Sequence, residues 1–280
     1  MNSFIGIVML VMLQGHGVRM AEVPSRLHPG SPFLVTVSGL VSGTSYDVRF
    51  DKADIPIKGS STVRLLLGID LAHPDGNDRI RLYERGMASP VTSVAIEIRR
   101  HVYASQYLKL PAYFVNLTPA ELKRAVKEEK ELDRIFANDT TNPLWKGDFI
   151  LPVHGIITTP FGVRRFLNGE PRAPHTGIDI AGKAGTPVAA TNDGIVCFEG
   201  NLFFGGNSIL INHGQGIYSM YFHLGKYAVK NGTYVKKGQT IAYIGETGRV
   251  TGPSLHFGVR IADSKVDPEL LFALTKTMHR

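Results

Sequence analysis

The sequence predicts a mostly-β protein in which an N-terminal β-sandwich, a linker helix and a C-terminal antiparallel β-sheet domain follow one another. Three observations support this: short alternating strands over residues 32–103, one charged segment with helix signals near residue 118, and glycine-rich strands from about residue 148. The 280 residues are enough for two domains, and a composition of 43% hydrophobic and 20% charged residues is that of a globular protein.

The first domain, over residues 28–105, is predicted to be a β-sandwich with strand spacing that resembles an immunoglobulin-like domain. Turn signals such as SGT and HPDGND separate its strands, and it contains no cysteine or tryptophan. It carries no pattern of catalytic residues, so we expect a spacer or docking module. The predicted strands are PFLVTVSGL, TSYDVRF, STVRLLLGI, RIRLY and VTSVAIEIRR.

Residues 118–147 are predicted to form a helix and a linker. Thr118 is suited to the N-cap, Pro119 to the first helical position, and Glu121 to a capping box with Thr118. The helix is charged on most sides and has only a partial apolar stripe, so we expect it to lie against one domain.

The second domain, over residues 148–275, is predicted to be an antiparallel sheet, because its strands are joined by Gly- and Asn-rich turns. Residues 207–224 should form a hairpin around HGQG, with Tyr221 and His223 on one face of the second arm.

The stretch TGPSLHFGVR, residues 251–260, is also predicted to be a strand. Alternation places Ser254, His256 and Gly258 on one face, with open space beside Gly258. Leu255, Phe257 and Val259 then form the core face. His256 is therefore directed away from the apolar core.

A second candidate group lies in APHTGIDIAG, where His175 and Asp179 are four residues apart. In an ideal strand their Cα atoms would be roughly 13 Å apart, so both can reach one ion only if the chain bends, which Gly177 permits. Two imidazoles, of His175 and His256, and the Asp179 carboxylate form a ligand set that suits Zn²⁺ with a fourth position left for water. Three protein ligands are typical of a catalytic rather than a structural zinc site.

The motifs HTGID, YFHLG and TGPSLHFGV resemble those of the lysostaphin-type zinc endopeptidases, which cut peptide cross-bridges of bacterial peptidoglycan. The resemblance extends over about residues 148–263. It implies that His175, Asp179 and His256 are the zinc ligands, that His223 is a catalytic histidine, and that peptidoglycan is the partner. In FGVRR, Arg164 is a candidate for the rim of the substrate cleft, with Arg165 beside it.

The sequence departs from the family at Ser254, where the family has the first histidine of a His-x-His pair. Serine can donate a hydrogen bond but cannot take up a proton near pH 7. The alternative function is therefore a zinc-binding but weakly active or inactive protein that binds the cell wall or regulates another hydrolase. A biotinyl- or lipoyl-like carrier is a third hypothesis, disfavoured because the one Asp-Lys-Ala, at Asp51, lies in the other domain.

The N-terminus predicts export. Residues 4–13, FIGIVMLVML, are too short to span a bilayer but match the apolar core of a signal peptide, expected to occupy residues 1–21. Cys197 is the only cysteine, which excludes an internal disulfide. We expect a periplasmic or secreted protein without stable membrane insertion. The net charge is +7 and the pI is near 9.4, but the basic residues are scattered, so nucleic acid is not an expected partner.

Overall fold

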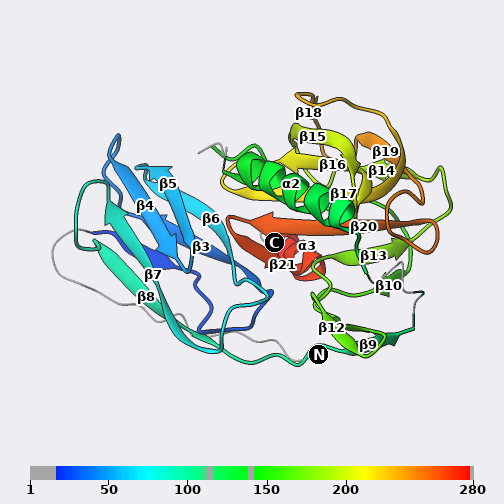
Figure 1. Cartoon of the computed structure of the whole chain (residues 1–280). Coiled ribbons are helices and arrows are strands. Elements are labelled where there is room, and N and C mark those ends of the chain that lie inside the picture. Colours follow the sequence, from blue (N-terminus) through cyan, green and yellow to red (C-terminus); the bar gives the residue numbers. More distant parts are fainter. Residues whose placement is uncertain (1–16, 110, 112–115, 138–141, 278–280) are drawn as a thin grey trace. The chain divides into compact units, whose positions relative to one another are not determined.

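A computed structural model describes residues 17–109, 111, 116–137 and 142–277, and the predicted apolar run at residues 4–13 lies outside them. The chain divides into two compact units: residues up to His101 together with Ile261–Val266, and Val102–Arg260 together with Asp267–Arg280. Both consist mainly of strands (Figure 1), as the sequence predicts. Neither helix of the described part is both long enough and apolar enough to span a bilayer.

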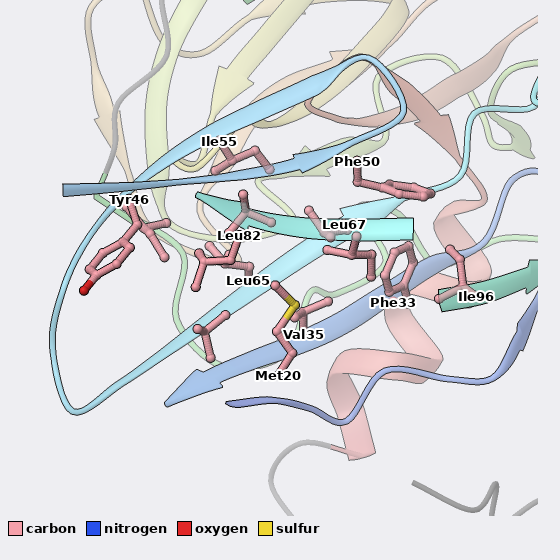
Figure 2. Packing of buried hydrophobic residues seen from close by; sticks show 14 of the residues in the cluster. Met20, Phe33, Val35, Tyr46, Phe50, Ile55, Leu65, Leu67, Leu82 and Ile96 are labelled. Carbon is pink, nitrogen blue, oxygen red and sulfur yellow. The ribbon is translucent and has the colours of Figure 1, made fainter. Parts of the chain in front are cut away.

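The first unit contains two sheets with a shared core, which confirms the predicted sandwich. One sheet has the order β1-β3-β6 and the other β2-β8-β7-β4-β5. Inward-facing side chains such as Phe33, Leu65 and Leu82 are at most 1% exposed and pack between the sheets (Figure 2). The strands are β1 (Arg19–Ala21), β2 (Arg26–Leu27), β3 (Pro32–Ser38), β4 (Ser45–Phe50), β5 (Ala53–Lys58), β6 (Thr62–Gly68), β7 (Gly76–Glu84) and β8 (Thr92–Ile98).

The sequence pattern does not predict strand β5. It contains Pro56, and proline cannot donate to a sheet ladder, so the segment does not have the pattern of a central strand. The structure places β5 at the edge of its sheet, paired only with β4, where proline is tolerated.

Helix α2 (Pro119–Phe136) begins as predicted. Thr118 Oγ1 accepts from the Glu121 amide, and the Glu121 carboxylate accepts from the Thr118 amide, which completes the capping box. The helix belongs to the second unit and packs against its strands: the Phe136 ring lies edge-on against Tyr218 at 5.1 Å, and Arg124 donates to Asn201.

The second unit is built on a ten-stranded sheet with the main order β10-β13-β20-β17-β16-β15-β18 (Figure 1). Its pairings β10–β13, β13–β20, β14–β19, β15–β16, β15–β18, β16–β17 and β17–β19 are all antiparallel, as predicted. The strands of the sheet are β10 (Ile157–Thr159), β13 (Ile178–Ala181), β14 (Pro187–Ala189), β15 (Gly194–Leu202), β16 (Gly206–Asn212), β17 (Ile217–Tyr227), β18 (Tyr234–Val235), β19 (Thr240–Ile244), β20 (Ser254–Ile261) and β21 (Ser264–Val266), the last of which falls in the residue range of the first unit.

A smaller sheet, of order β12-β11-β9, and a C-terminal helix complete the unit. Its strands are β9 (Ser105–Leu108), β11 (Arg164–Leu167) and β12 (Glu170–Arg172), and the helix is α3 (Pro268–Thr277). Strand β11 is central, and its two partners fix its register on both edges.

Candidate metal centre

Two neighbouring strands bring the candidate ligands together. Strands β13 and β20 are antiparallel, and their register places Asp179 directly opposite His256. Leu255, Phe257 and Val259 are fully buried on the other face, which confirms the predicted alternation of β20. Since directly opposed residues in a sheet lie close together, this pairing alone gives a carboxylate and an imidazole on one face.

His175 precedes β13 and reaches the same point because the chain bends before the strand begins. The bend was expected, but Gly177 is needed for space rather than for a left-handed conformation. A Cβ on Gly177 would collide with the Phe257 carbonyl oxygen and would lie 2.8 Å from His256 Nε2. Only glycine therefore fits between the bend and the His256 ring.

Three ligand atoms converge on one point. His175 Nε2 is 3.0 Å from Asp179 Oδ1 and 2.9 Å from His256 Nδ1, and His256 Nδ1 is 2.8 Å from the same oxygen. In a tetrahedral zinc site with bonds of about 2.0–2.1 Å, neighbouring ligand atoms are about 3.4 Å apart. Small side-chain movements would thus accommodate the ion. Within the described residues, this is the one group of His, Cys, Asp and Glu that could hold a metal.

The protonation of these side chains favours metal binding. His175 Nδ1 donates to the Pro160 carbonyl at 2.9 Å, so its proton is on Nδ1 and the lone pair is on Nε2. Burial lowers the pKa of His256, against the opposing effect of Asp179, and so keeps this imidazole neutral. Burial alone would raise the pKa of Asp179, but the close contacts of its carboxylate with the rings of His175 and His256 outweigh it and hold the pKa well below its usual range.

His223 lies beside the ligand set because of a bulge in β17. The β16–β17 register passes from Ile209↔Tyr221 to Asn207↔Leu224, so one residue of β16 opposes two residues of β17, Phe222 and His223. The predicted common face for Tyr221 and His223 is therefore wrong. Tyr221 is fully buried against Phe257, whereas the His223 ring lies 6.3 Å from the His256 ring.

The bulge is held in a strained conformation. His223 has a φ of 63°, a left-handed value that costs a non-glycine residue on the order of 1–3 kcal/mol. Its amide donates to Gly205 O at 2.7 Å, and its carbonyl accepts from Gly245 at 3.0 Å, so both neighbouring segments hold the bulge in place. Strained residues of this kind cluster at functional sites.

The orientation of His223 leaves one ring nitrogen available. Nδ1 donates to the Thr247 carbonyl at 2.9 Å, so the lone pair is on Nε2. Burial lowers the pKa of His223, and this outweighs the raising effects of Thr247 and Asp179. The ring is neutral at pH 7 and can accept a proton or a hydrogen bond at Nε2.

The remaining candidates occupy different positions. Ser254 is half-buried on β20, with Ala181 as its cross-strand partner. Arg164 is exposed, and its guanidinium lies over the Phe166 ring at 5.8 Å. Arg165, not Arg164, contacts the ligand set, with Nη2 3.4 Å from Asp179 Oδ2. The space expected beside Gly258 is filled by Met220, whose methyl group would lie 3.0 Å from an added Cβ.

The fold and these side chains define a metallopeptidase domain. Proteins of similar sequence and structure support this assignment. Residues 173–268 match the model of peptidase family M23, so the chain contains an M23 peptidase domain. The family and the two-imidazole, one-carboxylate ligand set both assign zinc as the cofactor. A crystal structure of a protein assigned to peptidase M23 from Pseudomonas aeruginosa superimposes with a TM-score of 0.65 at 25% identity, covering 88% of this chain and 95% of that one.

Two curated relatives match the same region. The DD-carboxypeptidase/endopeptidase Mpg of Neisseria meningitidis is 39% identical over 125 residues, which is 44% of this chain and 29% of the relative. The peptidoglycan DD-endopeptidase ShyB of Vibrio cholerae is 45% identical over 94 residues, 34% of this chain and 22% of the relative. The matches therefore span less than a third of the length of either relative.

Proposed function

We propose that the chain is a zinc-dependent endopeptidase that hydrolyses peptide cross-bridges of bacterial peptidoglycan. The observation that carries this proposal is the convergence of His175 Nε2, His256 Nδ1 and Asp179 Oδ1 within 3.0 Å of one another, beside a neutral His223. The M23 match and the relatives named as peptidoglycan DD-endopeptidases support the reaction and the substrate.

In this proposal His175, His256 and Asp179 hold the zinc, leaving one side of the ligand set open to substrate. When bound, zinc polarises an amide carbonyl and activates water at neutral pH. His223 presents the Nε2 lone pair, which can orient water and take up a proton as the amide is attacked. The Thr247 carbonyl contributes by holding the Nδ1 proton, because the opposite tautomer would have no lone pair at Nε2.

A second candidate function follows from Ser254. The hydroxyl can donate to an oxyanion, but it cannot replace an imidazole as a general acid or base near pH 7. If the family histidine supplies that assistance, its absence costs on the order of 10²–10⁴ in rate. The chain would then be a zinc-binding wall protein with weak activity or none.

The two candidates are separated by cleavage of isolated peptidoglycan, followed by mass spectrometry of cross-linked and released peptides. The zinc-loaded chain should convert cross-linked dimers to monomers, and a chelator should stop the reaction. His223→Ala should abolish cleavage with zinc still bound. His154→Ala is a matched control, because His154 is an exposed histidine of the same unit.

Undiminished cleavage by His223→Ala would refute the role of His223. A zinc-loaded wild-type chain that cleaves nothing, beside a Ser254→His variant that does, would establish the second function. Full metal loading with no cleavage by either protein would leave only wall binding, measured by co-sedimentation with the same peptidoglycan.

The substrate lies outside the cytoplasm, so the proposal includes export to the periplasm or the medium. Residues 4–13 supply the apolar core of the expected signal. N-terminal sequencing of the protein isolated from its native cell should find a mature chain that starts after about residue 15. A full-length product in the cytoplasm would contradict this part of the proposal.

A further inference from the structure

One cation contacts the metal-site carboxylate. Arg165 Nη2 lies 3.4 Å from Asp179 Oδ2, whereas both imidazoles contact Oδ1. The two carboxylate oxygens thus have different partners, and Oδ1 alone faces the point at which the ligand atoms converge.

The fold fixes the side on which Arg165 lies. In β11, successive residues point to opposite faces, so Arg164 and Phe166 share one face and Arg165 has the other. The strand is paired on both edges, with Arg165 opposite Gln106 of β9 and Arg172 of β12. The backbone of Arg165 cannot shift register without breaking both pairings, so its reach towards Asp179 is set by the sheet.

The guanidinium is only partly satisfied by this contact. Its Nε–H is buried and has no hydrogen-bond partner in the described part of the chain, although the side chain is 33% exposed. A buried donor without a partner costs about 1–3 kcal/mol, so the position is unfavourable for folding alone. The charge-assisted contact of Nη2 with Asp179 Oδ2 offsets part of that cost.

We propose that Arg165 is a positioning residue that holds Asp179 Oδ2, so that the carboxylate offers only Oδ1 to the metal. The inference rests on the proposed zinc site. Carboxylates that bind metals are themselves held by hydrogen bonds, which set their orientation, and the planar guanidinium fork suits a carboxylate better than a point charge does. With Oδ2 held, a further coordination position stays open to substrate and water.

The test uses the full chain stripped of metal and measures zinc affinity by competition with a chromophoric chelator. Arg165→Gln should weaken zinc binding by roughly 10–100-fold, the usual effect of removing a hydrogen-bond partner from a metal ligand. Arg165→Lys keeps the charge but not the fork and should lose most of the same affinity. Arg164→Gln removes an equal charge one residue away and should bind zinc as the wild type does.

A second readout reports ligand geometry without reference to activity. The Co²⁺-loaded wild-type chain should show the intense visible absorption of a four-coordinate site. Arg165→Gln should show weaker bands, because the freed Oδ2 can also bind the metal and raise the coordination number. The melting temperatures of the metal-free variants establish that each is folded, and Arg165→Lys provides the comparison if Arg165→Gln is not.

These measurements separate a failure of the proposed metal site from a failure of the proposed role of Arg165. A wild-type chain that binds neither zinc nor Co²⁺ would refute the proposed metal site itself. A wild-type chain that binds both, with Arg165→Gln identical to it in affinity and spectrum, would refute only the role of Arg165. Tighter zinc binding by Arg165→Gln, with no change in Arg165→Lys, would mean that the guanidinium acts through charge repulsion, and would overturn positioning.

Discussion

Acid should destabilise the second unit through His213, at the turn of the β16–β17 hairpin. This side chain is fully buried. Nδ1 donates to Asp193 O at 2.7 Å, so Nε2 accepts the hydroxyl proton of Ser219, also at 2.7 Å. Ser219 Oγ lies 3.0 Å from the Tyr221 hydroxyl, two residues before His223. Protonation would put a second N–H against Ser219 and a charge in the core.

The pKa gives the sign and the size of the effect. Burial lowers the pKa of His213 to about 4, from 6.5 in the unfolded chain. The unfolded state therefore binds a proton below pH 6.5 that the folded state refuses until about pH 4. The contribution of neutral His213 to the free energy of unfolding is therefore fully present above pH 6.5 and is lost as the pH falls towards 4. At 1.36 kcal/mol per pKa unit, the loss is on the order of 1 kcal/mol at pH 5.5 and roughly 2–3 kcal/mol at pH 4.5.

The assay is urea unfolding of the metal-free chain at pH 7.5, 6.5, 5.5 and 4.5. The single tryptophan, Trp145, reports on the second unit, because its amide donates to the His213 carbonyl and its ring lies 5.9 Å from Phe149. The burial of His223 and His256 also lowers their pKa values and adds to the loss, so His213→Gln is the reference.

That variant should be less stable at pH 7.5, because it loses buried hydrogen bonds, but its stability should fall less steeply with acid. The difference between the two pH profiles isolates His213. Parallel loss of stability in wild type and His213→Gln from pH 7.5 to 4.5 would refute the reasoning.

Three further outcomes are expected. Asp179→Ala should reduce zinc from about one ion per chain to a small fraction by elemental analysis, and full occupancy would remove Asp179 from the ligand set. Ser254→His should raise the cleavage rate by about 10²–10⁴-fold, because the small cross-strand partner, Ala181, leaves room for the added imidazole. An unchanged rate in a folded, zinc-loaded variant would contradict the hypothesis that the missing imidazole limits the reaction. Gly177→Ala should displace the His256 ring and weaken zinc binding by at least about 10-fold, whereas Gly252→Ala, which meets nothing within 4 Å, should not; equal affinities would contradict the close packing at Gly177.

The sequence by itself determined the features that depend on short-range patterns. Alternation predicted β20 and its buried face, and the capping box placed the start of α2. The motif around His175 and Asp179 predicted a bend, and the residue types predicted a zinc ligand set. The inferences about β20, α2 and the bend succeed because strand period, capping and local chain direction depend on residues within a few positions of one another, whereas the zinc ligand set, which includes the distant His256, stays a prediction.

Contacts between distant segments were decided only by the tertiary structure. Alternation assigned His223 to the face of Tyr221, but pairing with β16 introduced a bulge that separated them. No signal in FGVRR distinguishes Arg165 from Arg164, because their contacts depend on where β11 lies relative to β13. The predicted HGQG turn gives no sign that His213 is buried, yet Asp193 and Ser219 supply the partners that allow its burial. The physical reason is common to all three: a sequence specifies which face a side chain takes along an unbroken strand, whereas bulges, register and neighbouring segments decide what it meets there.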